Sequence, residues 1–377
     1  MPKILTSIAC NLDADILAAA LPLFEAEKVH AIEWSFDTLF NHQNIPDWFV
    51  ELLKAFSDEN RLIGHGVFFS LFSGKWLKEQ AFWLAHLRKV ASEFQFDHIT
   101  EHFGFMTGED FHKGAPISIP FTTSTLALGR DRLKRIQDAC RCPVGLENLA
   151  FSYSLEEVKK HGDFLNQLVE PINGFIILDL HNLYCQIHNF DMPFEDIIGY
   201  YPLERVREIH ISGGSWEPVL SNPHRQVRRD THDDSVPKEV FDLLKKTLPL
   251  CPNLKFVVLE QLGSGLNTEG SRQQFQEDFY ALDQLIETYN SLQNATTIHN
   301  FLPKRFINID DKPLEDNVLY TQQLQLSHIL ETAKDYKDAQ NLLTTSDLAH
   351  TDWYTERWQP YMLETALAIA QKWKNGV

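Results

Sequence analysis

The sequence predicts an α/β fold, a closed (β/α)8 TIM barrel with a C-terminal helical extension. Short apolar, β-branched segments alternate with longer helix-patterned segments, which is typical of parallel strands joined by crossover helices. Eight such units fit into about the first 290 of 377 residues, the size of a closed barrel. The segment Cys10-Asn11-Leu12 after the first strand lacks the glycine-rich phosphate turn of an open doubly wound sheet.

The elements follow in order along the chain. Capping residues around Asp13 favour the start of the first helix, and Pro46 and Pro237 lie where helices can begin without losing a hydrogen bond. The predicted strands are residues 4–11, 29–36, 62–69, 98–103, 144–148, 175–182, 206–213 and 254–262. The predicted helices are residues 13–28, 46–57, 77–94, 124–140, 154–168, 193–200, 237–247 and 271–290.

The pattern changes after about residue 290, where a polar stretch leads to helical segments at 321–336 and 358–374. Apolar residues recur there at three- and four-residue spacing, so we expect the last helix to dock on the barrel as a cap or to bind a partner. The expected domains are a catalytic barrel at 1–295, a linker at 296–315 and a helical extension at 316–377.

Composition excludes several classes of function. The formal net charge of −18 disfavours a nucleic-acid partner. No apolar run reaches the roughly 18 residues of a membrane span, and the N-terminus does not resemble a signal peptide, so we expect a cytoplasmic protein with no membrane partner. The five cysteines have no metal-knuckle spacing and are interpreted as buried thiols.

Acidic residues and histidines recur where six of the predicted strands end. In TIM barrels the reacting groups project from these carboxyl ends, so the side chains should meet at one rim. The loop after the seventh strand adds Asp230-Thr231-His232. The strand-end segments are Gly64-His65-Gly66, Thr100-Glu101-His102, Leu146-Glu147-Asn148, Asp179-Leu180-His181-Asn182, Ile209-His210-Ile211 and Leu259-Glu260-Gln261.

The apolar context of these residues favours metal binding. Asp179 and Glu260 end strands of buried type, where an uncompensated carboxylate would cost several kcal/mol. The neighbouring residues are imidazoles rather than lysines or arginines, which is the ligand set for two or three ions of iron, manganese or zinc. Strand alternation favours His102 over Glu101 as a ligand. It also places His181 on the face of Asp179, unless a turn at His181 brings Asn182 inward.

The ordered motifs resemble one enzyme family, the multinuclear non-heme iron-dependent oxidative enzymes typified by the methanobactin-biosynthesis oxidase. The resemblance covers about residues 1–290, and its motifs are specific in combination rather than singly. The residues that carry it are Gly64-His65-Gly66 with Ser70, Glu101-His102, Leu146-Glu147-Asn148, Leu178-Asp179 with Asn182, Glu208 to Gly213, Asp230-Thr231-His232 with Val236-Pro237, and Leu259-Glu260.

This resemblance implies a TIM barrel that holds two or three irons, mixed Fe(II)/Fe(III), with O2 as co-substrate. The implied substrate is a cysteine-containing ribosomal precursor peptide, often presented by a partner protein. Besides the ligand His65, the residues given catalytic or ligand-orienting roles are Ser70, Glu101 and Asn148. The implied metal ligands are His65, His102, Glu147, Asp179, Asn182, His210, Asp230, His232 and Glu260.

Two departures and three alternatives stay open. The family usually has a second asparagine where this chain has His181, and an acid where it has Leu262. The ligand order is also similar to zinc-dependent phosphodiesterases of the endonuclease IV type, which the charge of −18 and Asn182 in place of a histidine disfavour, although His181 could supply that ligand. A non-catalytic peptide-binding barrel and a sugar isomerase, for which the rim lacks a convincing lysine, rank lower.

Overall fold

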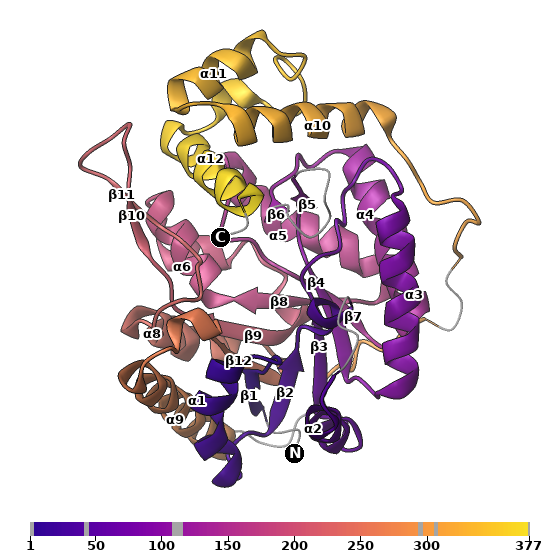
Figure 1. Ribbon diagram of the computed structural model, residues 1–377, viewed down its shortest axis with the longest axis vertical. Coiled ribbons are helices and arrows are strands. Elements are labelled where there is room, and N and C mark those ends of the chain that lie inside the picture. Colours follow the sequence, from indigo (N-terminus) through magenta and orange to yellow (C-terminus); the bar gives the residue numbers. More distant parts are fainter. Residues whose placement is uncertain (1–3, 41–44, 108–115, 293–296, 305–307, 376–377) are drawn as a thin grey trace.

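The computed structural model describes residues 4–40, 45–107, 116–292, 297–304 and 308–375. Its centre is a closed barrel of eight strands in which every neighbouring pair is parallel, so the predicted TIM barrel is confirmed (Figure 1). Each strand lies inside a predicted range. The barrel strands are β1 (Leu5–Ala9), β2 (Ala31–Trp34), β3 (Leu62–Gly66), β4 (His98–His102), β7 (Val144–Glu147), β8 (Phe175–Asp179), β9 (Val206–Ser212) and β12 (Phe256–Glu260).

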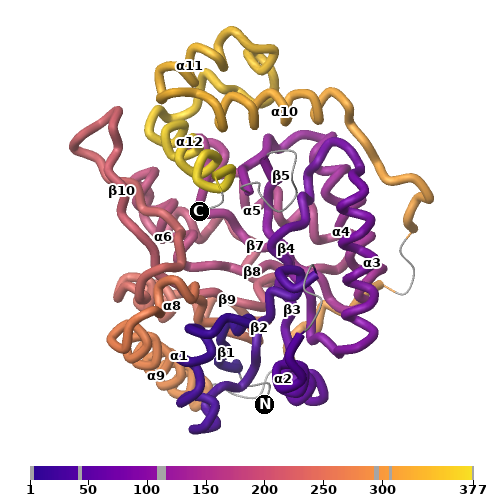
Figure 2. Tube along the Cα trace, viewed as in Figure 1, coloured from indigo at the N-terminus to yellow at the C-terminus, as the bar shows by residue number. Residues whose placement is uncertain are grey.

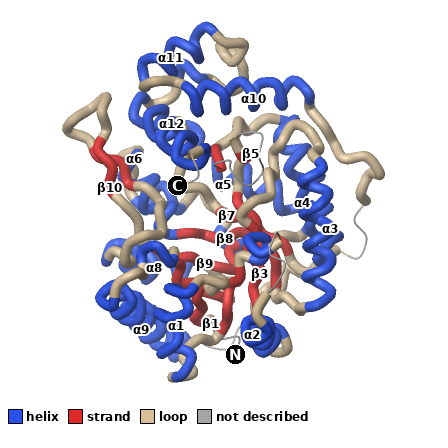
Figure 3. Tube along the Cα trace, in the orientation of Figure 1, coloured by secondary structure: helices blue, strands red, loops and turns tan. Residues whose placement is uncertain are grey.

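Helices surround the barrel, as Figure 3 shows in blue around the red strands. Asp13 caps the first of them by accepting hydrogen bonds from the backbone N–H groups of Asp15 and Ile16. The predicted helices that the structure contains are α1 (Ala14–Glu25), α2 (Asp47–Ser57), α3 (Lys78–Glu93), α4 (Thr123–Cys140), α5 (Leu155–Val169), α7 (Phe194–Ile198), α8 (Lys238–Thr247) and α9 (Glu269–Leu292).

Strand alternation divides the barrel residues into two sets. Odd and even positions of a strand face opposite sides of the sheet. Ile8, Ile32 and Leu259 belong to the large core between strands and helices. Their neighbours Ala9, Ala31, Ile63, Phe256 and Val258 form a separate small core. This small core is therefore inside the barrel, and residues that share its parity point inward.

The connection after β8 differs from the sequence prediction. The strand ends at Asp179, and an unpredicted helix, α6 (Leu180–Asn189), begins at once. The Asp179 side chain caps this helix by accepting the backbone N–H of Asn182. The prediction that residues 180–182 continue the strand is wrong, because this cap allows a direct change from strand to helix at Leu180. The first turn of the helix brings Asn182 toward Glu147, which agrees with the alternative of a turn near His181.

Other unpredicted elements are short. Two hairpins, β5 (Phe105–Met106) with β6 (Pro116–Ile117) and β10 (Trp216–Pro218) with β11 (Gln226–Arg228), have strands too short to show a two-residue period. In the extension, α11 (Tyr336–Thr345) buries only Ala339 and Leu343, which gives it little helical pattern in the sequence.

The extension packs on one end of the barrel, as the golden to yellow helices at the top of Figures 1 and 2 show. It consists of α10 (Asn317–Thr332), α11 and α12 (Pro360–Lys374). The Gln323 side chain of α10 hydrogen-bonds Phe72 O at 2.7 Å and Gly74 N at 2.9 Å, in the loop after β3. A Cβ atom on Gly74 would lie 2.6 Å from the backbone of Asp316, so this close approach requires glycine.

The expected boundary at residue 295 and part of the expected linker lie outside the described residues, so the domain limits remain a proposal. Of the helices in the described ranges, none has the length and apolarity needed to cross a membrane.

Candidate metal centre

Six predicted ligands share the inward parity of the small core and lie at the carboxyl ends of their strands. For example, His65 follows Ile63 by two residues, and Glu260 follows Val258 by two. The register pairs His102 with Glu147, and Asp179 with His210, on neighbouring strands. The inward-facing ligand candidates are His65, His102, Glu147, Asp179, His210 and Glu260.

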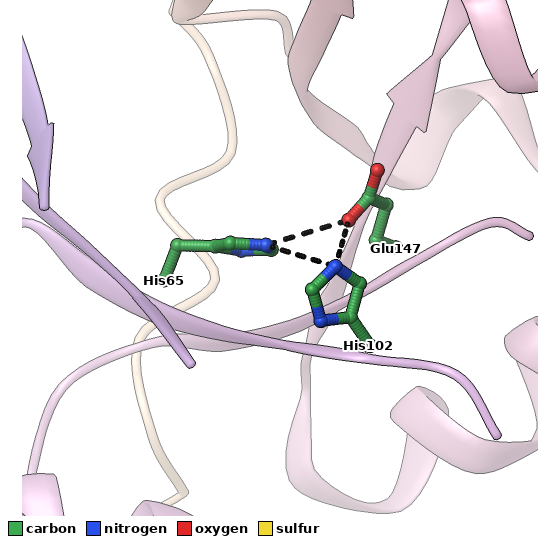
Figure 4. A group of neighbouring side chains, drawn as sticks. All are labelled: His65, His102 and Glu147. Atoms are coloured by element: carbon green, nitrogen blue, oxygen red, sulfur yellow. Dashed lines mark hydrogen bonds and ion pairs between the residues drawn. The ribbon is translucent and has the colours of Figure 1, made fainter. Parts of the chain in front are cut away.

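His65, His102 and Glu147 form the first group, with three ligand atoms facing one point (Figure 4). His65 Nε2 lies 3.4 Å from His102 Nε2 and 3.5 Å from Glu147 Oε2, and His102 Nε2 lies 3.4 Å from the same oxygen. Thr100 Oγ1 donates to Gly64 O, so the 2.8 Å contact leaves His65 Nδ1–H as the donor to Thr100. The free lone pair of His65 Nε2 therefore faces Glu147.

Asp230, His232 and Glu260 form the second group. His232 Nε2 lies 2.7 Å from Asp230 Oδ2, and His232 Nδ1 lies 3.3 Å from Glu260 Oε1. His232 has a φ of 54°, in the left-handed region that non-glycine residues rarely adopt. The backbone hydrogen bond from Leu262 N to His232 O, at 2.7 Å, holds this loop against the end of β12.

Glu147, Asp179 and His210 connect the two groups, since their ligand atoms also lie within 4.8 Å of one another. His210 Nδ1 lies 3.3 Å from Glu260 Oε2. Asn182 donates to Glu147 Oε1 at 3.2 Å, which places its side chain at the edge of the first group. The nine predicted ligands therefore meet at one mouth of the barrel.

Several ligand atoms at this mouth have no hydrogen-bond partner although they are buried. They are Glu147 Oε2, Asp179 Oδ2, Asn182 Oδ1 and His210 Nδ1. A buried polar atom without a partner is costly, and a bound cation would satisfy the oxygens and the imidazole nitrogen that face the cluster. Among the described residues, the ion pairs of Glu147, Asp230 and Glu260 are with histidines alone. The donor set fits iron, manganese or zinc.

Burial favours the neutral form of two carboxylates and two imidazoles of the cluster, whereas Glu33 raises the pKa of His210, and Asp230 that of His232, above the ordinary value against the effect of burial. Burial raises the pKa of Glu147 well above its ordinary value, and burial beside Asp230 raises that of Asp179 to about 7. Burial lowers the pKa of His65 well below its ordinary value and that of His102 to about 4. At neutral pH both imidazoles are therefore neutral, as ligands must be, and a cation would displace the proton of Glu147.

His181, where the family usually has a second asparagine, lies beside the second group but is fully engaged. Arg228 Nε donates to His181 Nε2 at 3.0 Å, so the ring accepts there and its Nδ1–H donates to Asp230 Oδ1 at 2.8 Å. The imidazole thus orients Asp230. The side chain of Leu262, at the other departure, is 48% exposed and offers no ligand atom.

Glu101, Ser70 and Asn148 lie around the cluster in different ways. Glu101 has the outward parity, and its buried carboxylate accepts the backbone N–H of His102 at 3.0 Å. A Cβ atom on Gly66 would lie 2.1 Å from Glu101 Oε1, which explains the second glycine of Gly64-His65-Gly66. Neither Glu101 nor Ser70, whose Oγ accepts Met106 N at 3.0 Å, belongs to the three ligand groups.

Asn148 instead braces the end of β8. Its Oδ1 accepts Asp179 N at 2.7 Å, and its Nδ2 donates to Asp179 O at 3.2 Å. This pair of hydrogen bonds fixes the backbone that carries one ligand candidate.

Sequence reasoning missed Glu33, and it quoted Glu208 in a family motif without giving it a role. Glu33 Oε2 accepts a hydrogen bond from His210 Nε2 at 3.1 Å, and Glu208 Oε1 lies 3.6 Å from the same nitrogen. These carboxylates hold the proton on Nε2 and leave Nδ1 facing the mouth, the usual arrangement behind a metal-bound histidine. Both residues share the inward parity of their strands, and that alternation was the signal that could have found them.

The sequence matches one known family over most of the barrel. The family model described as "RiPP precursor modification enzyme MbnB/TglH/ChrH" matches residues 27–261. A UPF0276 protein of Alcanivorax borkumensis is 25% identical over 51% of this chain and 62% of its own length. One from Caulobacter vibrioides is 27% identical over 48% and 61%. The chain thus spans less than two thirds of the length of these curated relatives.

Solved structures are similar at low sequence identity and with TM-scores below 0.5. A zinc-bound IOLI protein has a TM-score of 0.47 and 11% identity, over 76% of this chain and 99% of its own. The D-psicose 3-epimerase of Clostridium cellulolyticum has a TM-score of 0.46 and 14% identity, over 74% and 98%. Because the family model covers more than half of the residues and includes every ligand candidate, the chain belongs to the MbnB/TglH/ChrH family of RiPP precursor modification enzymes.

Proposed function

We propose that this protein is a multinuclear iron-dependent oxidase that uses dioxygen to modify cysteine residues of a ribosomally made precursor peptide. The observation that carries the proposal is the cluster of four imidazoles and four carboxylates at one barrel mouth, with unpartnered ligand atoms and no lysine or arginine paired to Glu147 or Glu260 among the described residues. Family membership supports a precursor peptide as the substrate class.

The residues divide into two ligand groups with a bridge. His65, His102 and Glu147, whose ligand atoms lie within 4.8 Å of one another, would hold one ion. Asp230, His232 and Glu260, which ion pairs through His232 bring together, would hold a second. Iron bound there, in mixed Fe(II) and Fe(III) states, supplies electrons to dioxygen and a site for the cysteine thiolate.

The surrounding residues prepare these ligands. Thr100 keeps the proton of His65 on Nδ1, and Glu33 keeps that of His210 on Nε2, so both free lone pairs face the mouth. Asn148 fixes the backbone of Asp179, and His181 orients Asp230. Fixed orientations lower the reorganisation needed when substrate arrives.

The position of His181 favours the oxidase over the zinc-dependent phosphodiesterase. That hydrolase reading needs a histidine ligand near Asn182, and His181 was its candidate. Arg228, a cation, donates to Nε2 of His181, and Nδ1 holds a proton toward Asp230, so a metal ion at this ring would meet a positive charge. His232 differs because both of its ring partners, Asp230 and Glu260, are carboxylates that are themselves ligand candidates.

The test uses full-length protein purified without oxygen, together with cysteine-bearing peptides encoded beside its gene. Metal content is measured by mass spectrometry of the elements, and the peptides are analysed by mass spectrometry after oxygen is admitted. Each peptide has a control in which serine replaces cysteine. We expect two or three irons per chain and an oxygen-dependent mass change in a cysteine peptide alone.

A protein that holds only zinc and hydrolyses bis(p-nitrophenyl) phosphate would contradict the proposal and support the hydrolase. An equal mass change in the serine control would exclude the thiol as the reacting group.

A further inference from the structure

A pocket of about 170 Å³ opens beside the ligand cluster. Part of its lining is ligand candidates, namely His102, Glu147, Asn182 and Asp230. The pocket is smaller than the roughly 300 to 1,000 Å³ of pockets that enclose whole small-molecule ligands. It therefore fits one or two residues of a longer chain that continues through the opening.

The C-terminal helix α12 forms another part of the same lining. Its contribution is apolar apart from one hydroxyl, and consists of Met362, Thr365, Ile369 and Trp373. Residues three and four apart share one face of a helix, so these four side chains form a single stripe. Exposure increases along the stripe from 1% at Met362 to 41% at Trp373, so the stripe runs from a buried end to an open end.

Contacts with the barrel loops fix the position of α12. Glu364 accepts hydrogen bonds from Ser221 N at 3.1 Å and Ser221 Oγ at 2.8 Å, in the loop between β10 and β11. At the start of the helix, Gln359 N donates to Tyr153 O at 2.9 Å, and Trp358 stacks on the Tyr153 ring at 3.7 Å. These contacts hold the stripe in place beside the ligands.

The stripe also lies outside the part of the chain that the family model matches, which ends at residue 261. The wall that it forms is therefore a feature of the extension rather than of the matched barrel.

We propose that the stripe formed by Met362, Thr365, Ile369 and Trp373 is a specificity surface that contacts the residues beside the reacting cysteine and selects apolar ones. This inference rests on the proposed function for the identity of the reacting residue. Arg228 and Arg229 also line the pocket, so the selection acts at the wall formed by α12. An apolar side chain against this wall buries surface on Ile369 and Trp373, whereas a polar one there loses hydrogen bonds to water.

The test measures anaerobic binding of three synthetic peptides to the iron-loaded full-length protein by calorimetry. The peptides are acetyl-Leu-Cys-Leu-amide, acetyl-Gln-Cys-Gln-amide and acetyl-Leu-Ser-Leu-amide. We expect the leucine peptide to bind about tenfold more tightly than the glutamine peptide. Ile369→Glu should reduce this preference to about twofold or less, because it places a charge on the stripe.

Ala368→Glu is the matched control, since it introduces the same charge at the exposed neighbouring position outside the pocket lining. It should keep the tenfold preference, and both variants should keep the wild-type iron content. Trp373→Ala is a milder second variant, expected to lower the preference about threefold if Ile369→Glu does not fold.

Equal binding of the leucine and glutamine peptides by the wild type, or an unchanged preference in Ile369→Glu and Trp373→Ala, would overturn the inference. The cysteine and serine peptides separate it from the proposed function. Equal binding of these two, with the leucine preference intact, would count against thiol chemistry and support the specificity surface.

Discussion

The two ends of the barrel both bury carboxylates beside histidines, but they neutralise them differently. At the amino ends of the strands, Asp97 accepts hydrogen bonds from Arg207 Nη2 at 2.7 Å and His98 Nδ1 at 2.8 Å, and it also pairs with Lys255. At the carboxyl ends, Glu147 and Glu260 have only imidazoles as ion-pair partners among the described residues.

This difference appears in the pKa values. Burial acts to raise the pKa of Asp97, but His98, Arg207 and Lys255 outweigh it and hold this pKa below its ordinary value. At the other end, burial raises the pKa of Asp179 to about 7. The amino end is thus a completed salt-bridge network suited to stability. At the carboxyl end, Glu147 and Glu260 pair with imidazoles alone among the described residues, which suits these carboxylates to bind cations.

The largest expected effect is that of Glu147→Gln. Glu147 belongs to two of the three ligand groups, so its loss should remove at least one metal ion per chain and lower turnover more than about 100-fold. Elemental analysis and the peptide assay check this result, and circular dichroism should show an intact barrel. Wild-type metal content in this variant would contradict the proposed role of the carboxyl end.

Asp97→Asn should lower the stability of the protein but leave its metal content unchanged, the opposite of what we expect for Glu147→Gln. It leaves Arg207, which is 2% exposed, without its carboxylate partner and should lower the free energy of unfolding by about 3 kcal/mol. The metal content should stay at the wild-type value. Denaturation by urea measures the free energy of unfolding, and elemental analysis measures the metal content. A loss of metal would show that the salt bridges at the amino end are needed for metal binding at the carboxyl end.

Glu33→Gln should act mainly through His210, the residue to which Glu33 is hydrogen-bonded. Removing the charge that holds the proton on His210 Nε2 should weaken metal binding about 10- to 100-fold without changing the number of sites. Competition with a chelator of known affinity measures the change. An unchanged affinity would mean that Glu33 does not orient this ligand.

The last prediction concerns the pH dependence of stability in metal-free protein. In metal-free protein, folded Asp179 keeps its proton up to about pH 7, whereas the unfolded chain releases it near pH 4. The folded state then binds more protons, so this group's contribution to stability falls as pH rises from about 4 to 7. Wild-type protein should lose about 1.4 kcal/mol per pH unit more than Asp179→Asn over this range. If chemical denaturation shows that the free energy of unfolding depends on pH equally in the wild type and in Asp179→Asn, the prediction is wrong.

Much of this contrast could be predicted from the sequence. Eight apolar strands and the acids and histidines at their ends predicted the barrel and the common location of His65, Glu147 and Glu260, because parallel strands place their carboxyl ends together. The alternation of side chains along a strand was enough to distinguish His102, which faces the inside of the barrel, from Glu101, which faces outward.

The remainder depends on contacts between distant residues. The pattern of apolar residues does not show whether the chain continues as a strand after Asp179 or begins a helix that Asp179 caps. The salt bridge of Asp97 with Arg207 joins residues 110 positions apart, and the stripe on α12 reaches the ligand cluster only through packing of the extension. Glu33 was missed because it lies inside a short strand rather than at the strand's last residue.

The most direct test of the account is anomalous X-ray diffraction at the iron absorption edge from crystals grown without oxygen. The account predicts one iron peak among His65, His102 and Glu147, and another among Asp230, His232 and Glu260, with none beside Asp97. The absence of a peak at the carboxyl end, or peaks that appear only at the zinc edge, would contradict it.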